Sequence, residues 1–319
     1  YERIPAHILE DEEVASEVMA GKIADAINAA EGVFRLGLST GSSPVILYRD
    51  LVKLYQEGKV SFSNVEIYTI DEYYPAPADN QSRNRRLYEE LISKVDVKPE
   101  NVHVPKIPEI MDIDLVTEFC AAYDAKASGL DLLVMGTGEK GQIGFNEAGA
   151  SENSRTRTVH LSYGSRKRQA KNFAGNLDET PHSAIALGIS TMMTAKKIYL
   201  IGWGEDKAQV VKNIVEDPVN PACPASFLQK HGNISFYVDE NSGSLLTRNV
   251  APWLVGPCEW TPKFIRKAVV WLCEQVHKPI LKLSQGDYLA NGLGELLEQF
   301  GPYDQINIKV FNDLQHTIS

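Results

Sequence analysis

Short apolar runs of strand length alternate along this chain with amphipathic stretches of helix length, and no other feature restricts its fold as strongly. The alternation is typical of a parallel sheet covered by helices on both faces. The sequence therefore predicts an open, doubly wound, mainly parallel α/β sheet, a Rossmann-like three-layer fold. The expected strands are 33–39, 65–70, 130–136, 197–202 and 234–239, and the expected helices are 11–30, 44–57, 85–94, 114–128, 165–172 and 206–216.

The strand and helix alternation pauses at residues 251–261, where prolines frame two tryptophans. We therefore expect residues 1–258 to form the main domain and residues 259–319 to form a small C-terminal α/β extension. Within the extension, the pattern predicts helices at 263–276 and 288–300 and strands at 280–283 and 306–311. About sixty residues are marginal for an independent core. The extension is thus expected to pack on the main domain or to lead into a domain missing from this sequence.

Composition excludes several functional classes. The 32 Lys and Arg residues against 42 Asp and Glu residues give a net charge of −10, which disfavours nucleic acid as a partner. The densest basic run, 155–171, is expected to be a solvated face with a few cations available to a small anion. We expect no membrane association and a cytoplasmic location, because the chain lacks a membrane-length apolar run and a signal-peptide layout. Neither the four cysteines nor the seven histidines have metal-ligand spacing, so no metal site is expected.

The loop after the first expected strand, STGSSP, combines a glycine, several hydroxyl groups and a proline at the start of a helix. Such a loop presents unpaired backbone N–H groups at the positive end of a helix and so favours a phosphate. The alternative is an ordinary helix start capped by Ser43. From this loop alone, both interpretations stay open.

The other expected strands also end in polar residues, at the sheet edge where open α/β folds bind ligands. Asp71 and Glu72 end the second strand, so at least one carboxylate needs a partner or is held ready as a base, unless the pair merely caps the next segment. The third strand enters a glycine-rich turn at Gly136, but the pattern is too weak to predict a nicotinamide cofactor. Lys207 lies in the first turn of a helix, where a bound anion would offset its unfavourable position in the helix dipole.

Taken together, these loops resemble those of the glucosamine-6-phosphate deaminase/isomerase family, whose relatives include the 6-phosphogluconolactonases. The segments LGLSTGSSP, IDEY, GxxGxIxFNE, SRTR and GxxKA match in order and spacing across residues 36–239. The resemblance implies a sugar 6-phosphate substrate, no cofactor, and Asp71 as the base that moves the C2 proton to C1 before water releases fructose 6-phosphate and ammonia. It further implies phosphate or substrate contacts at Thr40, Gly41, Ser42, Ser43, Glu72, Gly136 and Lys207, with Lys171 where the family usually has arginine.

The third loop departs from the family pattern GxDGH. Lys140 and Gln142 stand where the family's Asp and His open the sugar ring, while Glu147, which would hold that His, is retained. Glutamine cannot exchange a proton near neutral pH, and a lysine near Asp71 would weaken the carboxylate as a base. Asp71, Glu147, Lys140 and Gln142 are therefore the expected catalytic positions, with Lys140 as an alternative acid/base or imine-forming group.

Several functional hypotheses follow. The first is a deaminase/isomerase that converts glucosamine 6-phosphate, and the second is a divergent sugar-phosphate isomerase or lactonase. The third is a catalytically impaired sugar-phosphate-binding or regulatory module, and a nucleotide-binding module is a distant fourth. The resemblance leaves a homo-oligomer open. It also implies that a longer parent chain continues into a domain resembling metal-dependent N-acetylglucosaminyl deacetylases.

Overall fold

Seven parallel strands form the central sheet of the computed structural model, which describes residues 1–109 and 112–318. In spatial order they are β1 (Ala6–Leu9), β10 (Ile234–Asp239), β9 (Ile198–Gly202), β6 (Leu132–Gly136), β2 (Phe34–Leu38), β3 (Val65–Thr69) and β5 (Val102–His103). The five expected strands are confirmed within two residues at each end, whereas β1 and β5 were not predicted. Because β2 is flanked by β3 and β6, the carboxyl ends of β9, β6, β2 and β3 lie side by side at one edge.

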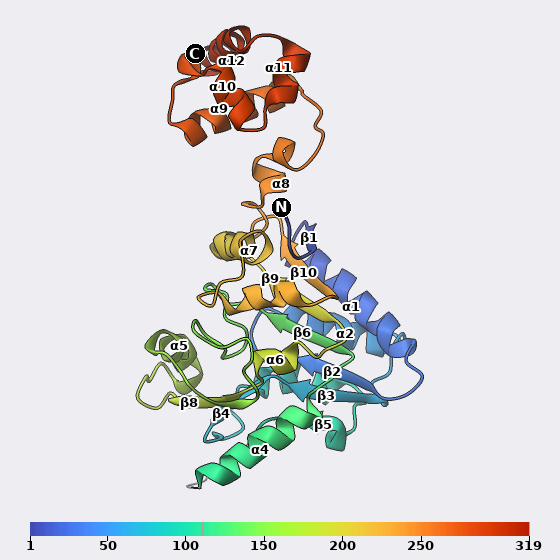
Figure 1. Ribbon diagram of the computed structural model, residues 1–319. Helices are drawn as coiled ribbons and strands as arrows, with labels where there is room; N and C mark the ends of the chain where they lie inside the picture. The colour runs from blue at the N-terminus through green and yellow to red at the C-terminus, as the bar shows by residue number, and fades with distance from the viewer. Residues whose placement is uncertain (110–111, 319) are drawn as a thin grey trace. The chain divides into compact units, whose positions relative to one another are not determined.

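Helices cover both faces of the sheet (Figure 1). On one face α1 (Glu12–Asn28) and α2 (Val45–Gln56) share an apolar core with alternate residues of the strands, among them Leu36, Leu38 and Val134. On the other face, Tyr123 of α4 (Ile113–Lys126) donates a hydrogen bond to the backbone oxygen of Thr69. The expected three-layer α/β fold is therefore confirmed.

A second, antiparallel sheet lies beside this edge and was not predicted. Its strands are β4 (Asp71–Tyr74), β8 (Ser183–Ala186) and β7 (Arg157–His160). Tyr73 packs in a small apolar cluster with Phe145 and Phe173, which fixes β4 against the loop that follows β6. The chain therefore passes from β3 through Ile70 directly into a strand that begins with Asp71.

The remaining helices of this part of the chain are short. Residues 85–94 and 165–172, each expected as one helix, are divided between an α-helix and a 3-10 turn, and the helix expected at 206–216 is confirmed by α7 after a 3-10 turn. The α-helices are α3 (Arg85–Glu90), α5 (Tyr163–Gln169), α6 (Ile189–Met192) and α7 (Ala208–Val215). The 3-10 turns are Ile92–Lys94, Pro99–Asn101, Ala170–Phe173, Glu205–Lys207 and Pro224–Lys230.

The chain divides into two compact units, one formed by Glu2–Ser244 and the other by Tyr1 with Leu245–Ser319. The division lies upstream of the predicted boundary at 258, because Ala251 and Trp253 belong to the apolar core of the second unit. The Trp253 ring lies 5.2 Å from that of Trp271 and 6.1 Å from that of Trp260. The tryptophan-rich segment at the predicted boundary is thus part of the second unit's core.

The described part of the second unit is helical, so the predicted α/β extension is wrong in its strands. It consists of α8 (Thr247–Val250), α9 (Pro262–Val276), α10 (Gln285–Ala290), α11 (Gly294–Phe300) and α12 (Tyr303–Ile318), with 3-10 turns at Pro252–Leu254 and Ile280–Lys282. Residues 280–283, expected as a strand, are occupied mainly by the second turn, and 306–311 lie within α12. Ile306 and Val310 are buried one helical turn apart, which shows that the helical period prevails there.

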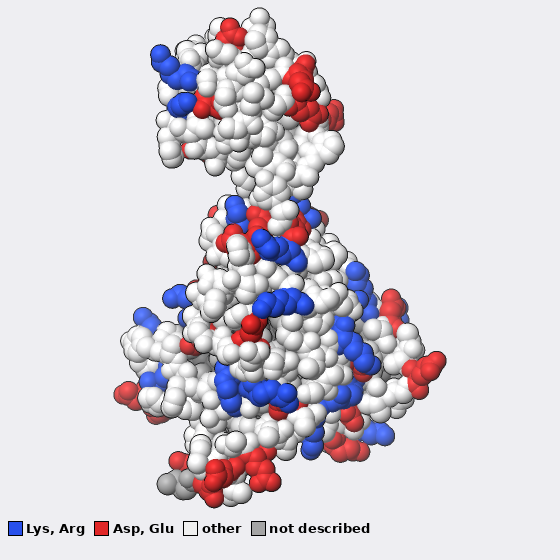
Figure 2. Space-filling view, viewed as in Figure 1, with Lys and Arg blue, Asp and Glu red and all other residues white. Residues whose placement is uncertain are grey.

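Among the helices of the described residues, none has both the length and the apolar character needed to cross a membrane. Figure 2 shows acidic and basic side chains mixed over the visible face of Glu2–Ser244.

Candidate functional site

A cavity of about 610 Å³ lies where the carboxyl ends of β2, β3 and β6 meet the start of α7. Its lining includes all four residues of the 40–43 loop, together with Gly136, Gln142, Lys171 and Lys207. Eight of the twelve predicted site residues therefore line one cavity. The other four, Asp71, Glu72, Lys140 and Glu147, are not part of that lining.

The 40–43 loop is held by contacts from the segment that joins β9 to α7. The indole N–H of Trp203 donates to the backbone oxygen of Ser43 at 2.9 Å, and Lys207 Nζ donates to Ser43 Oγ at 3.4 Å. Pro44 precedes α2 and no side chain caps this helix, so Ser43 does not act as the cap. Among the described residues, the buried Ser39 Oγ, which also lines the cavity, has no hydrogen-bond partner. Ser39, next to the loop, therefore keeps an unused hydrogen-bonding group at the cavity wall.

Gly136 allows the 40–43 loop to lie close to the end of β6. A Cβ atom at this position would lie 2.9 Å from both Cβ and Oγ of Ser43. Since Trp203 fixes the backbone of Ser43, the loop cannot easily move away. The close approach of Ser43 thus requires a glycine at position 136, which agrees with the interpretation of the loop as a phosphate site.

The Gly136→Ala variant tests this close approach. We expect it to lower the free energy of unfolding by about 1–3 kcal/mol, the usual cost of overpacking, and to weaken phosphate binding by displacing Ser43. Urea unfolding and calorimetric titration with inorganic phosphate would measure the two effects. Gly232→Ala is the matched control, because a Cβ at Gly232 meets no atom within 4 Å. Equal stability of the two variants would contradict the prediction.

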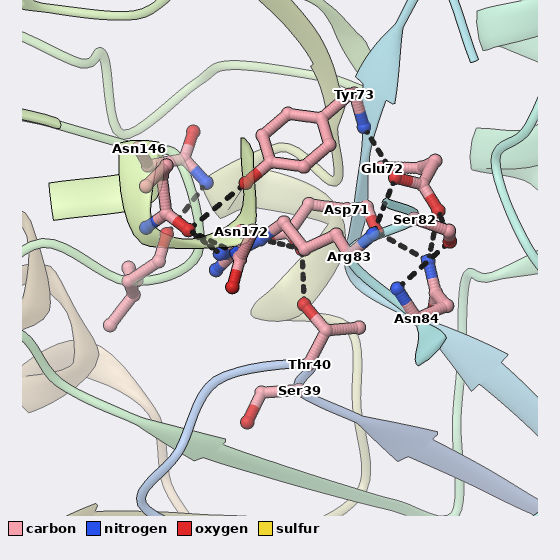
Figure 3. Close-up of polar contacts among 12 residues, drawn as sticks. Ser39, Thr40, Asp71, Glu72, Tyr73, Ser82, Arg83, Asn84, Asn146 and Asn172 are labelled. Carbon is pink, nitrogen blue, oxygen red and sulfur yellow. Dashed lines mark hydrogen bonds and ion pairs between the residues drawn. The ribbon is translucent and has the colours of Figure 1, made fainter. Parts of the chain in front are cut away.

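Asp71 lies at the start of β4 and is fully buried. Its Oδ1 accepts hydrogen bonds from Thr40 Oγ1 at 2.6 Å and from Arg83 Nε at 2.8 Å, as Figure 3 shows. Burial alone would lower the pKa of Arg83, but Asp71 and Tyr73 outweigh it and raise that pKa, so the guanidinium stays charged. The cation beside Asp71 is therefore Arg83, whereas the sequence had led us to expect Lys140.

The second oxygen of Asp71 has no hydrogen-bond partner among the described residues. A Cβ atom at Gly144, which lines the cavity, would lie 2.9 Å from this Oδ2 atom. The absence of a side chain at Gly144 therefore lets the loop after β6 pack closely against the buried Oδ2 atom. A buried carboxylate oxygen without a partner is costly in a structural role, which points to a functional one.

Glu72, expected as a substrate contact, instead points away from the cavity and is fully buried. Its carboxylate accepts hydrogen bonds from the backbone N–H groups of Tyr73 and Arg83 at 2.8 and 3.0 Å, and from Asn84 Nδ2 at 2.9 Å. Ser82 Oγ donates to it as well (Figure 3). Glu72 therefore positions the 82–84 segment and, through it, the Arg83 side chain.

The loop after β6 is folded back on itself. Gln142 Oε1 accepts a hydrogen bond from the backbone N–H of Lys140 at 3.0 Å, and its amide lies where a side chain at Gly138 would be. The Lys140 side chain is exposed and does not line the cavity. Of the two residues that replace the expected ring-opening pair, only Gln142 lies within reach of a ligand in the cavity.

Glu147 does not hold Gln142 but contacts the start of α5. Ser165 Oγ donates to the Glu147 carboxylate and accepts a hydrogen bond from Arg168 Nη2 at 2.8 Å. Glu147 thereby acts through Ser165 on Arg168, a cavity-lining cation. This arrangement places Glu147 behind the cavity wall.

The cavity is strongly basic. Six basic side chains line it against two acidic ones, Glu89 and Glu139; the basic residues are Arg83, Arg85, Arg86, Arg168, Lys171 and Lys207. None of the four arginines was predicted individually, although Arg168 lies in the basic run 155–171 that was expected to offer a few cations to a small anion. The cluster of three between positions 83 and 86, shortly after the Asp71–Glu72 pair, was the available signal.

Comparison with known proteins is consistent with this geometry. Residues 10–236 match the family described as glucosamine-6-phosphate isomerases/6-phosphogluconolactonase. The chain is 42% identical to a putative glucosamine-6-phosphate deaminase-like protein of Bacteroides thetaiotaomicron, over 100% of this chain and 49% of that protein. It thus spans about half the length of that relative. It is 35% identical to glucosamine-6-phosphate deaminase 2 of Bacillus subtilis, over 75% of this chain and 96% of that protein.

Two solved structures extend the comparison. A monomeric glucosamine-6-phosphate deaminase superposes with a TM-score of 0.70 at 30% identity, over 76% of this chain and 100% of that chain. The 6-phosphogluconolactonase from Leishmania guyanensis superposes with a TM-score of 0.57 at 20% identity, over 76% of this chain and 98% of that chain. The second likeness supports the fold alone.

Proposed function

We propose, because the chain belongs to the family of glucosamine-6-phosphate isomerases and 6-phosphogluconolactonases, that its basic cavity binds a sugar 6-phosphate. The observation that carries this proposal is the convergence of the 40–43 loop, Gly136 and Lys207 at the end of one cavity. Loop N–H groups and the Lys207 ammonium form the phosphate site, with Lys171 as a further cation. The sugar then extends toward Arg83 and Asp71.

The reaction that we propose for this site is deamination with isomerisation of an amino-sugar 6-phosphate. Asp71 removes the C2 proton of the open-chain sugar and returns it to C1, while a second proton passes from the amine nitrogen to the C1 oxygen; one C–H bond breaks, another forms, and the amine becomes an imine. Water then hydrolyses the resulting C2 imine, which gives fructose 6-phosphate and ammonia without any oxidation or reduction. The unpartnered Asp71 Oδ2 beside Gly144 supports this role.

A second candidate function is sugar-phosphate binding without turnover. It is favoured by the ion pair between Arg83 and Asp71 and by the folded-back Gln142, which provides no proton for ring opening. This candidate uses the same phosphate site and differs only in the reacting end of the cavity. Ligand affinity and product release therefore distinguish the two functions.

Calorimetric titration with glucosamine 6-phosphate and a coupled assay for ammonia and fructose 6-phosphate test the proposal. We expect submillimolar binding, weakened about 10- to 100-fold in Lys207→Met, the range expected from losing a charged hydrogen bond. Binding without ammonia release would favour the second candidate. Binding that Lys207→Met leaves unchanged would contradict the phosphate site itself.

The pH dependence of binding offers a separate prediction. Burial lowers the pKa of Lys207 below the ordinary 10.5, with Asp206 and Glu139 partly opposing the shift. The ammonium is present below this lowered pKa and is lost as the pH rises through it, while the sugar phosphate stays a dianion above about pH 6. Affinity for glucosamine 6-phosphate should therefore begin to fall at a pH below 10.5. Titrations between neutral and alkaline pH would measure this, and Lys207→Arg should remove the decline because arginine does not deprotonate there.

The cytoplasmic location, the homo-oligomer and the fused deacetylase domain stay predictions of the sequence. They do not enter the proposed reaction.

A further inference from the structure

Arg83 lines the cavity and contacts the buried carboxylate of Asp71 behind it. Its Nε atom donates to Asp71 Oδ1 at 2.8 Å, and the side chains of Arg83 and Asp71 are 12% and 0% exposed. Arg83 lines the cavity and Asp71 does not. The guanidinium group thus lies between the carboxylate and the space that a ligand would fill.

The guanidinium group is held in this place from several sides. Its central carbon lies 4.2 Å from the centre of the Phe145 ring, and Nη1 donates to Gln169 Oε1 at 3.2 Å. The Arg83 backbone N–H is fixed by Glu72. Asp71 opposes the positive charge directly, and the ring face of Phe145 and the amide oxygen of Gln169 add weaker attraction.

This cover has two chemical consequences for a ligand. Asp71 Oδ1 already accepts two hydrogen bonds, from Thr40 and Arg83, so the lone pairs of this oxygen are not available to take up a proton. The guanidinium also presents positive charge at the reacting end of the cavity, where it opposes the protonated amine of an amino sugar. Both effects act on the reacting group and not on the phosphate site around Lys207.

We infer that Arg83 is a specificity-determining residue that closes Asp71 to the cavity, so that the carboxylate acts on a bound amino-sugar phosphate only after the guanidinium has left Oδ1. This inference rests on the proposed function, because it assumes that the reacting carbon of the sugar lies next to Arg83. Arg83 thus limits the reaction, although it belongs to neither the phosphate loop nor the expected proton relay. Arg83 therefore suppresses deamination in the resting protein.

The test compares Arg83→Met with Arg86→Met. Both remove one positive charge from the lining of the same cavity, but Arg86 makes no hydrogen bond or ion pair to Asp71 among the described residues. Methionine keeps an apolar side chain over Phe145 while it uncovers the carboxylate. Arg83→Gln is the second variant, for use if methionine prevents folding as judged by a cooperative thermal transition.

The first measurement is carboxylate labelling with a water-soluble carbodiimide and a small amine, followed by peptide mass spectrometry. Asp71 should be protected in the unaltered protein and in Arg86→Met, and labelled at least tenfold more in Arg83→Met. An Asp71 that stays protected in folded Arg83→Met and Arg83→Gln would overturn the inference. This readout does not depend on turnover.

The second measurement is ammonia release from saturating glucosamine 6-phosphate. We expect kcat to rise at least tenfold in Arg83→Met, with little change in KM because the phosphate site is intact, and no such rise in Arg86→Met. A lower kcat in Arg83→Met would overturn the inference, since Arg83 would then assist the reaction. Labelled Asp71 with no ammonia from any variant would uphold Arg83 as the cover and refute the proposed deamination.

Discussion

Asp71→Asn is expected to lower the free energy of unfolding by about 3 kcal/mol, as measured by urea denaturation. The substitution keeps the shape of the side chain but leaves Arg83 as a mostly buried cation without its carboxylate partner. Breaking one side of a buried ion pair typically costs about 3–5 kcal/mol. The lower end applies here, because the cavity gives the Arg83 side chain some access to water.

A double-mutant cycle with Arg83→Met isolates the interaction between the two side chains. Because the double variant leaves neither charge buried alone, its loss of stability should be smaller than the sum of the two single losses by at least about 1 kcal/mol. The surface pair Arg49–Glu90 is the comparison, with side chains 60% and 20% exposed and an N–O distance of 2.8 Å. Its coupling should lie within about 0.2–1 kcal/mol. Strictly additive losses for Asp71 and Arg83 would show that the pair does not act as a unit.

Parts of this fold follow from local sequence alone. The five strands at the centre of the large sheet are buried at nearly every position, so each is a mainly apolar run that is visible without tertiary information, interrupted only by Arg35 in β2, Glu66 in β3 and Ser235 in β10 before the polar residues at the strand ends. The phosphate loop is equally local, since its glycine, hydroxyl groups and Pro44 are consecutive. By contrast, β4 begins with two carboxylates, and its pairing with β8 depends on residues more than a hundred positions away.

The second unit misleads local reasoning for a different reason. The segment INIKVF alternates apolar and polar residues as a strand does, but Asn307 in it is buried and not on a solvent face. Its side chain accepts a hydrogen bond from Tyr288 Oη at 2.7 Å and donates to the backbone oxygen of Leu283 at 3.0 Å. A buried asparagine that joins three segments satisfies its polar atoms only in the folded unit. The alternation of apolar and polar residues in this segment therefore does not reflect a strand.

The sequence also could not assign the cation at Asp71. Lys140 was the expected neighbour, because it stands in the loop that the family uses for ring opening. Arg83 takes this place since the chain turns back after β4 and Glu72 fixes the 82–84 segment beside Asp71. That turn depends on tertiary contacts. The sequence alone therefore did not indicate which of the three nearby arginines would face the carboxylate.

Glu72→Ala should lower the free energy of unfolding by at least about 3 kcal/mol, because it leaves four donors without their acceptor at a buried site. Each buried donor left unsatisfied costs about 1–3 kcal/mol, and partial relaxation of the 82–84 segment toward the cavity keeps the total below the simple sum. Urea denaturation would measure the loss. Hydrogen exchange at the Arg83 amide should become faster in the same variant, since its bond to Glu72 is gone.

Glu89→Ala is the matched control for Glu72→Ala. Glu89 lies close in sequence and lines the cavity, but its side chain is 55% exposed and pairs only with Arg85 at the i,i+4 spacing among the described residues. Its replacement should change stability by less than about 0.5 kcal/mol. If Glu72 were a substrate contact, Glu72→Ala would instead weaken glucosamine 6-phosphate binding and leave stability near that of Glu89→Ala. The ratio of the two stability losses therefore decides whether the second carboxylate of the pair holds the fold or the ligand, and the hydrogen bonds to residues 82–84 favour the fold.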